Sequence, residues 1–213
     1  VAAEKYPDVK FTAFGGLCLN RPVGGLNPDA VETSLKLGAK VIWLPTNTAE
    51  NHYRKNGKDP SKGVVVTRDG KAVDELQDIF ALVKQYNAVL ATGHIGAEEC
   101  FPVVEAARAA GVEKIVITHP EFWVVGMTPE QQADIVRKYD VLLESVYAQP
   151  VNGSYKINIP DNIAAMKAIG PEHFVISTDS GQTVNPYWYE SYTTYFKAVS
   201  EVFTSEQVRR MTH

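Results

Sequence analysis

Short apolar runs recur along the chain, and each run is followed by a stretch with helical periodicity. The runs start roughly 30 residues apart, with one longer interval, and this is the length of a strand plus a returning helix. Apolar residues within the runs are mostly continuous, as in VIWL and IVI, which is typical of parallel strands covered on both faces. The pattern predicts strands at 9–14, 40–44, 88–91, 114–118, 141–145 and 173–177.

Residues that favour helix ends lie between these runs. Asn27-Pro28 favours the start of a helix, and Gly38 lies close to its expected end. Thr128 is followed three residues later by Gln131, which is the pattern of a capping box. We therefore expect helices at 28–37, 73–86, 97–110, 129–139, 161–169, 187–203 and 205–211.

The longer interval holds an extra segment. Residues 63–73, GVVVTRDGKAV, are typical of a small hairpin with Asp69-Gly70 at its turn. We expect an insertion at about 45–72 that decorates the rim of a single domain covering 1–213. Six βα units fit either an open doubly wound sheet or an incomplete TIM-type (β/α)8 barrel. The GxGxxG and Walker patterns of nucleotide-binding sheets are missing. The choice between the two architectures therefore depends on the polar residues at the strand ends.

Composition narrows the class of protein. The 213 residues are 45% hydrophobic and 22% charged, as in ordinary soluble domains, and no apolar run approaches the roughly 18 residues of a membrane span. The formal net charge of −4 and the scattered basic residues argue against a nucleic-acid partner. Cys18 and Cys100 are too few for a disulfide framework, so we expect two buried thiols in a cytoplasmic protein.

Polar residues follow several of the expected strands. His94, His119 and Asp179 come directly after the third, fourth and sixth strands, at the edge where ligands bind in parallel α/β folds. Imidazole and carboxylate groups are ligands that Zn²⁺ and its neighbours accept, so we predict a divalent metal site, with zinc as the expected ion and one or two ions bound. Asp179 could take a proton from metal-activated water as general base.

Further polar residues near the same edge are candidates for contact with a small-molecule substrate. Each candidate also has a structural interpretation: the histidines could be hydrogen-bonded core residues, and Asp179 could cap a turn. His52 lies in an expected polar loop, where a solvated side chain is the ordinary case. The candidate substrate residues are Asn47, Asn51, His52, Glu144 and Gln182.

Three short motifs resemble the strand ends of one superfamily. GH (93–94), THPE (118–121) and STDSG (177–181) resemble the fifth, sixth and eighth strand ends of the amidohydrolase superfamily. The stretch from FGGLCLN through VGGLNPDAVE to VIWLPTNTAENH is similar to the DUF6282 branch, and the resemblance runs along nearly the whole chain. It implies a (β/α)8 barrel in which His94 and His119 bind metal, while Asp179 is both ligand and proton-shuttling base.

The sequence also departs from that superfamily. It has no HxH, the usual first-strand motif, and VIWLP is followed by Thr46 and Asn47 where many relatives have a Lys or Glu. The resemblance therefore implies strands three to eight of a barrel truncated at both ends. Such a piece would expose two sheet edges, and we expect it to be unstable alone or to self-associate as a homo-oligomer.

The expected activity is that of an enzyme. The resemblance implies hydrolysis of a small-molecule C–N, C–O or P–O bond by metal-activated water. Two alternatives remain open on the same scaffold. One is a metal-dependent decarboxylase or another lyase, and the other is a catalytically silent barrel that binds a small molecule.

Overall fold

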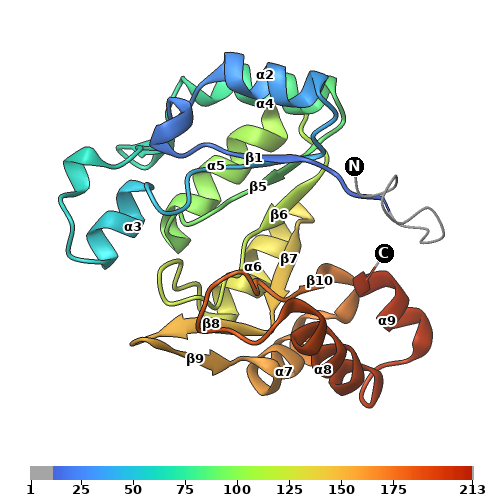
Figure 1. The fold of residues 1–213 in the computed structure, drawn as a ribbon. Coiled ribbons are helices and arrows are strands. Elements are labelled where there is room, and N and C mark those ends of the chain that lie inside the picture. Colours follow the sequence, from blue (N-terminus) through green and yellow to red (C-terminus); the bar gives the residue numbers. More distant parts are fainter. Residues whose placement is uncertain (1–11, 213) are drawn as a thin grey trace.

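A six-stranded, all-parallel sheet with the strand order β1-β2-β5-β6-β7-β10 forms the centre of the molecule (Figure 1). The computed structural model describes residues 12–212. Each strand pairs in parallel with the next one in this order. The strands are Gly16–Cys18 (β1), Val41–Trp43 (β2), Val89–Ala91 (β5), Ile115–Ile117 (β6), Leu142–Val146 (β7) and Phe174–Ser177 (β10).

Helices follow one another along the sheet in the order of the chain (Figure 1). Contacts join α2 to α4, α5 to α6, α6 to α7, α7 to α8 and α8 to α9. A doubly wound sheet would distribute its helices over both faces, so a row of neighbouring helices indicates the wall of a (β/α) barrel. The helices are Pro28–Lys36 (α2), Glu50–Lys55 (α3), Leu76–Gln85 (α4), Ala97–Ala109 (α5), Pro129–Tyr139 (α6), Ile159–Ile169 (α7), Trp188–Ser200 (α8) and Ser205–Thr212 (α9).

Strand residues alternate between the helix layer and the opposite face of the sheet. Ile42, Leu90 and Leu143 are fully buried in the core that also contains the apolar residues of the helices. Residues one position away, such as Trp43 and Glu144, instead line a pocket. The fold class expected from the sequence is confirmed, with six βα units in the described residues. Within 12–212, no helix combines the length and apolar character needed to cross a membrane.

The expected strands and helices are confirmed within a few residues, apart from the first strand. That strand was expected at 9–14; residues 9–11 lie outside the described part, and residues 12–14 have no regular structure. The strand is Gly16–Cys18, and its glycine has a packing reason. A Cβ on Gly16 would lie 2.4 Å from Cζ3 of Trp43, so only glycine lets the indole of the next strand pack here.

The hairpin expected at 63–73 is confirmed, and a second hairpin was missed. Asp69 and Gly70 both have positive φ at the first turn. Asn152 and Gly153 occupy the second turn with φ of 51° and 77°, as the Asn-Gly pair favours in two-residue hairpin turns. The paired strands are Thr67–Arg68 (β3) with Lys71–Ala72 (β4), and Ala148–Val151 (β8) with Ser154–Ile157 (β9).

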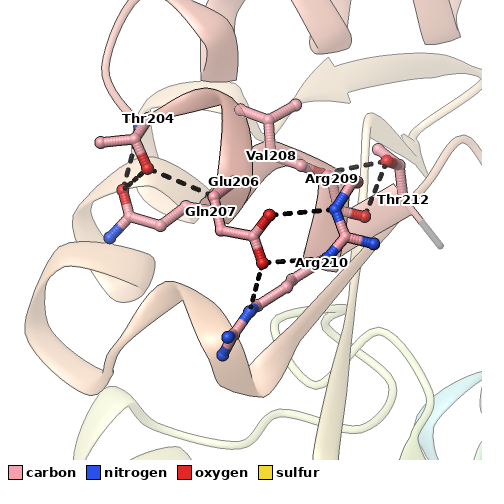
Figure 2. A network of polar contacts seen from close by, with 7 residues as sticks. All are labelled: Thr204, Glu206, Gln207, Val208, Arg209, Arg210 and Thr212. Atoms are coloured by element: carbon pink, nitrogen blue, oxygen red, sulfur yellow. Dashed lines mark hydrogen bonds and ion pairs between the residues drawn. The ribbon is translucent and has the colours of Figure 1, made fainter.

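Hydrogen bonds between side chains and backbone cap the N-terminus of helix α9 (Figure 2). The backbone N–H of Gln207 donates to Thr204 Oγ1, and the Gln207 side chain accepts from the Thr204 backbone N–H at 3.0 Å. Glu206 accepts hydrogen bonds from Arg209 and Arg210 on the exposed side. The opposite side buries apolar residues of α9 in the core, so capping and packing act together to hold this helix.

Candidate functional site

A pocket of about 550 Å³ opens at the carboxyl ends of the parallel strands. It brings together His94, His119 and Asp179, the three residues predicted to bind metal. Four of the five predicted substrate residues also line it: Asn47, His52, Glu144 and Gln182. The remaining lining residues are Cys18, Trp43, Thr46, Asn56, Thr118, Phe122, Trp123, Pro150 and Ser177.

Gly93 carries the chain into the pocket at the tip of β5. Its φ is +64°, and a Cβ at this position would lie 2.4 Å from the carbonyl oxygen of Leu44. The backbone therefore passes close over the end of β2, where the His94 N–H donates to the Pro45 carbonyl at 2.9 Å. Glycine at 93 lets the chain make this crossing and places His94 at the pocket wall.

His119 is held in an uncommon state at the tip of β6. It is 4% exposed, its φ is +25°, and its Nδ1 is buried without a hydrogen-bond partner among the described residues. The ring meets Phe122 edge-on, with centroids 4.8 Å apart. An unsatisfied buried nitrogen costs about 1–3 kcal/mol, and strain of this kind collects at functional sites.

The three histidines of the pocket are in contact as a row. Nδ1 of His52 and Nδ1 of His94 lie 2.8 Å apart, and the two rings lie side by side with nearly parallel planes and centroids 4.9 Å apart. The ring of His94 in turn lies 5.0 Å from that of His119. The expectation of a polar loop around His52 was wrong, because this residue lies on α3 and its ring packs against His94.

Asn51 does not line the pocket, in contrast to its predicted contact with substrate. It is 3% exposed, and its Nδ2 donates to the carbonyls of His94 at 3.0 Å and Val124 at 2.8 Å. Both bonds satisfy loop carbonyls that a helix or sheet would otherwise pair. The side chain therefore anchors α3 to the loop that carries His94.

Burial keeps the imidazoles neutral. Burial, with a smaller contribution from neighbouring histidines, lowers the pKa of His94 to about 2 and that of His119 to about 4. Burial also lowers the pKa of His52, with Lys58 contributing. Neutral imidazole is the form that binds a metal ion or accepts a proton.

Two carboxyl groups, those of Glu144 and Asp179, lie on the β7 and β10 side of the site. Burial raises the pKa of Glu144 to about 7, although Ser177 and the His119 backbone N–H donate to its carboxylate. Burial raises the pKa of Asp179 as well, and a hydrogen bond from Gln182 opposes that shift. The backbone of Asp179 has a φ of +48°, a left-handed conformation that aspartate adopts more readily than most residues.

Glu121 was not among the candidate residues. Its Oε1 lies 3.4 Å from the Val146 backbone nitrogen, and burial together with Glu144 and Asp179 raises its pKa to about 7. The sequence held a signal for it, because a charged residue directly follows the His-Pro pair of THPE.

Aromatic residues form the apolar part of the pocket. Trp43, Phe122 and Trp123 line it, and Trp123 is 42% exposed. Sequence patterns could not separate these residues from ordinary core residues. Cys18, expected to be a buried thiol, is only half-buried; its Sγ lies 3.2 Å from Thr46 Oγ1 at the pocket wall.

The donor set is compatible with a metal ion but does not form a closed site. Neutral imidazoles and a carboxylate suit a divalent cation of the zinc type, as does the buried Nδ1 of His119, which has no hydrogen-bond partner within residues 12–212. In the part of the chain that the structure describes, however, no group of three or more His, Cys, Asp or Glu side chains is arranged to hold a metal ion.

Solved structures share the fold at low sequence identity. An amidohydrolase from Pseudomonas aeruginosa superposes with a TM-score of 0.57 and 13% identity, covering 87% of this chain and 65% of that one. The dipeptidase AC, a metallo peptidase, gives 0.60 and 11%, covering 89% and 59%. A 2,6-dihydroxybenzoate decarboxylase from Rhizobium gives 0.55 and 13%, covering 100% and 71%.

These likenesses establish the fold, and the chain spans 57–65% of the length of the first three solved structures that it matches. Among curated proteins, no sequence matches the chain. A family model matches residues 1–144, which is more than half of the chain. The chain therefore belongs to the family described as "Family of unknown function (DUF6282)".

Proposed function

We propose that this chain carries part of the active site of a metal-dependent hydrolase that acts on a small molecule. The observation that supports it most is the convergence of His94, His119 and Asp179 on one pocket from the tips of three strands. The likeness to an amidohydrolase and to a metallo peptidase supports the same reading through the fold.

In this proposal each residue has a defined task. His94 and His119 would hold a divalent metal ion, with zinc as the expected species. Such an ion lowers the pKa of a bound water to about 7. Asp179, whose pKa burial raises, would accept the proton of that water as general base.

The pocket supplies the substrate site. Its volume of about 550 Å³ is that of a small-molecule pocket, and its lining includes both aromatic and amide side chains. Asn47 and Gln182 would hydrogen-bond the substrate, while Trp43 and Trp123 would contact its apolar part. The bond attacked would be a C–N, C–O or P–O bond.

Metal titration of the natural full-length protein tests this proposal. The wild type is expected to bind Zn²⁺, whereas His94→Ala and Asp179→Ala are expected to bind it at least about tenfold more weakly, because each loses a direct ligand. His173→Ala, which changes a histidine outside the pocket, is the matched control and should bind like the wild type. Equal binding by all four proteins would contradict the site assignment.

A catalytically silent barrel that binds a small molecule is the second candidate. The absence of a three-ligand cluster within residues 12–212 favours it. The same titration separates the two candidates, because a silent barrel would not bind Zn²⁺ through His94. A decarboxylase on this scaffold would bind the metal and would differ only in releasing CO₂ from its substrate.

A further inference from the structure

The insertion supplies a side chain that contacts a predicted metal ligand. His52 Nδ1 and His94 Nδ1 are 2.8 Å apart, a distance at which one nitrogen donates a proton to the other. We propose that His52 is a positioning residue that fixes the tautomer and the ring orientation of His94. This inference rests on the proposed function, in which His94 binds the metal.

The position of the proton in this bond decides whether Nε2 of His94 can bind a metal ion. Two neutral imidazoles share this bond, so only one of the two Nδ1 atoms carries a proton. If His94 is the donor, its Nε2 has a free lone pair and can bind a metal ion. If His52 is the donor, His94 carries its proton on Nε2 and cannot bind through that atom. An acceptor at His52 Nδ1 therefore selects the metal-binding tautomer of His94.

The backbone of His94 is constrained independently of this bond. The two ring planes lie nearly parallel, at 16° with centroids 4.9 Å apart, as two imidazoles joined edge to edge through one N–H···N bond do. On the neighbouring position of α3, the buried Asn51 holds the carbonyl of His94 at 3.0 Å. Helix α3 thus contacts His94 through its backbone and through its ring.

Helix α3 is itself fixed within the insertion. The Glu50 N–H donates to the Val64 carbonyl at 3.0 Å, and a Cβ on Gly63 would lie 2.4 Å from Glu50 Cα. Glycine at 63 is thus needed for the insertion to close against the start of α3. The insertion was expected to decorate the rim; in this inference it orients a residue of the site.

Two substitutions at position 52 separate the acceptor role from mere packing. In His52→Asn, the amide oxygen takes the place of the Nδ1 acceptor, whereas His52→Leu keeps an apolar side chain and loses the acceptor. The probe is Zn²⁺ alone, titrated in competition with a chelating dye against the natural full-length protein. We expect His52→Leu to weaken Zn²⁺ binding by about 10- to 100-fold, as loss of an outer-shell partner does, and His52→Asn to stay close to the wild type.

A second readout does not depend on metal loading. ¹⁵N NMR of the metal-free protein reports the tautomer of His94, and we expect the Nδ1–H form in the wild type and in His52→Asn. The His52→Leu protein should lose that preference. Thermal melting of the metal-free variants shows whether each one folds, and His173→Leu is the matched control for exchange of a histidine.

The outcomes distinguish this inference from the function on which it rests. A wild type that binds no Zn²⁺ contradicts the proposed function. If the wild type binds Zn²⁺ and a folded His52→Leu protein binds it equally well, the positioning role is overturned while the function stands. If His52→Asn is as weak as His52→Leu, the acceptor argument is overturned.

Discussion

Single residues at the strand tips carry unusual backbone and polar states. His119 and Asp179 have positive φ although they are not glycines, and a buried nitrogen of His119 has no partner among the described residues. Gly93 has a conformation and surroundings that only glycine tolerates. The strained histidine and the crowded glycine lie at the tips of two neighbouring strands beside one pocket, which supports a functional role for the pocket.

Gly93 and Gly57 form a matched pair for testing this view. Their φ angles are +64° and +65°, but a Cβ on Gly93 would meet two carbonyl oxygens at 2.4 and 2.6 Å. No atom of the described residues lies within 4 Å of a Cβ on Gly57. We expect Gly57→Ala to lower the free energy of unfolding by about 1–2 kcal/mol through left-handed strain alone. Gly93→Ala should cost clearly more, as measured by urea denaturation. Equal losses would show that the close approach at Gly93 is unimportant.

The raised pKa of Glu121 predicts how the free energy of unfolding changes with pH. Its folded-state pKa of about 7 lies above the ordinary 4.5, so the folded protein binds the proton more tightly than the unfolded chain does. The stability that this group contributes is full below pH 4.5 and is lost as pH rises through about 7. The isosteric Glu121→Gln protein lacks this loss, so its free energy of unfolding relative to the metal-free wild type should increase between pH 5 and 7.5. If the difference in free energy of unfolding between the two proteins stays constant over this range, the pKa of Glu121 is not raised.

At the scale of elements, local caps decide where helices begin. Thr204 and Gln207 exchange hydrogen bonds at the start of α9 (Figure 2). Thr204→Ala removes the side-chain acceptor and should lower the free energy of unfolding by about 1 kcal/mol, measured by chemical denaturation. Thr194→Ala, at an exposed position inside α8, should be neutral or slightly stabilising because alanine has the higher helix propensity. A larger loss from Thr194→Ala than from Thr204→Ala would contradict the capping argument.

The sequence predicted elements well where a period and a cap agreed. The helix that begins at Pro129 follows a Thr128 cap, and its observed bounds are those expected. The first strand was misplaced because a glycine does not indicate a strand in a local pattern. Gly16 is needed in β1 only because Trp43, a residue distant in the sequence, packs against it. Helix α3 was missed because its six residues, ENHYRK, lack an apolar period.

For the site as well, local sequence patterns predicted some residues correctly, and tertiary packing decided the others. Strand-end position correctly brought His94, His119 and Asp179 to one pocket, because parallel strands end at the same edge. It could not separate Asn51 from His52, which are neighbours in the sequence. Only the packing of α3 turns one side chain into the protein interior and the other toward His94.

At the scale of the whole molecule, the sheet has two open edges within residues 12–212. There, β1 pairs only with β2 and β10 pairs only with β7. Unpaired strand edges favour association with other chains. We therefore expect the 213-residue chain, expressed alone, to show a concentration-dependent mass in light scattering. A monodisperse monomer that melts cooperatively would contradict this expectation.

Anomalous X-ray diffraction at the zinc absorption edge, on crystals grown with Zn²⁺, locates any zinc ion that His94, His119 and Asp179 hold together. We expect an anomalous peak inside the pocket, within about 2.0–2.2 Å of ligand atoms of His94, His119 and Asp179. A peak bound elsewhere on the molecule, or a pocket without any anomalous density at saturating Zn²⁺, would contradict the proposed site.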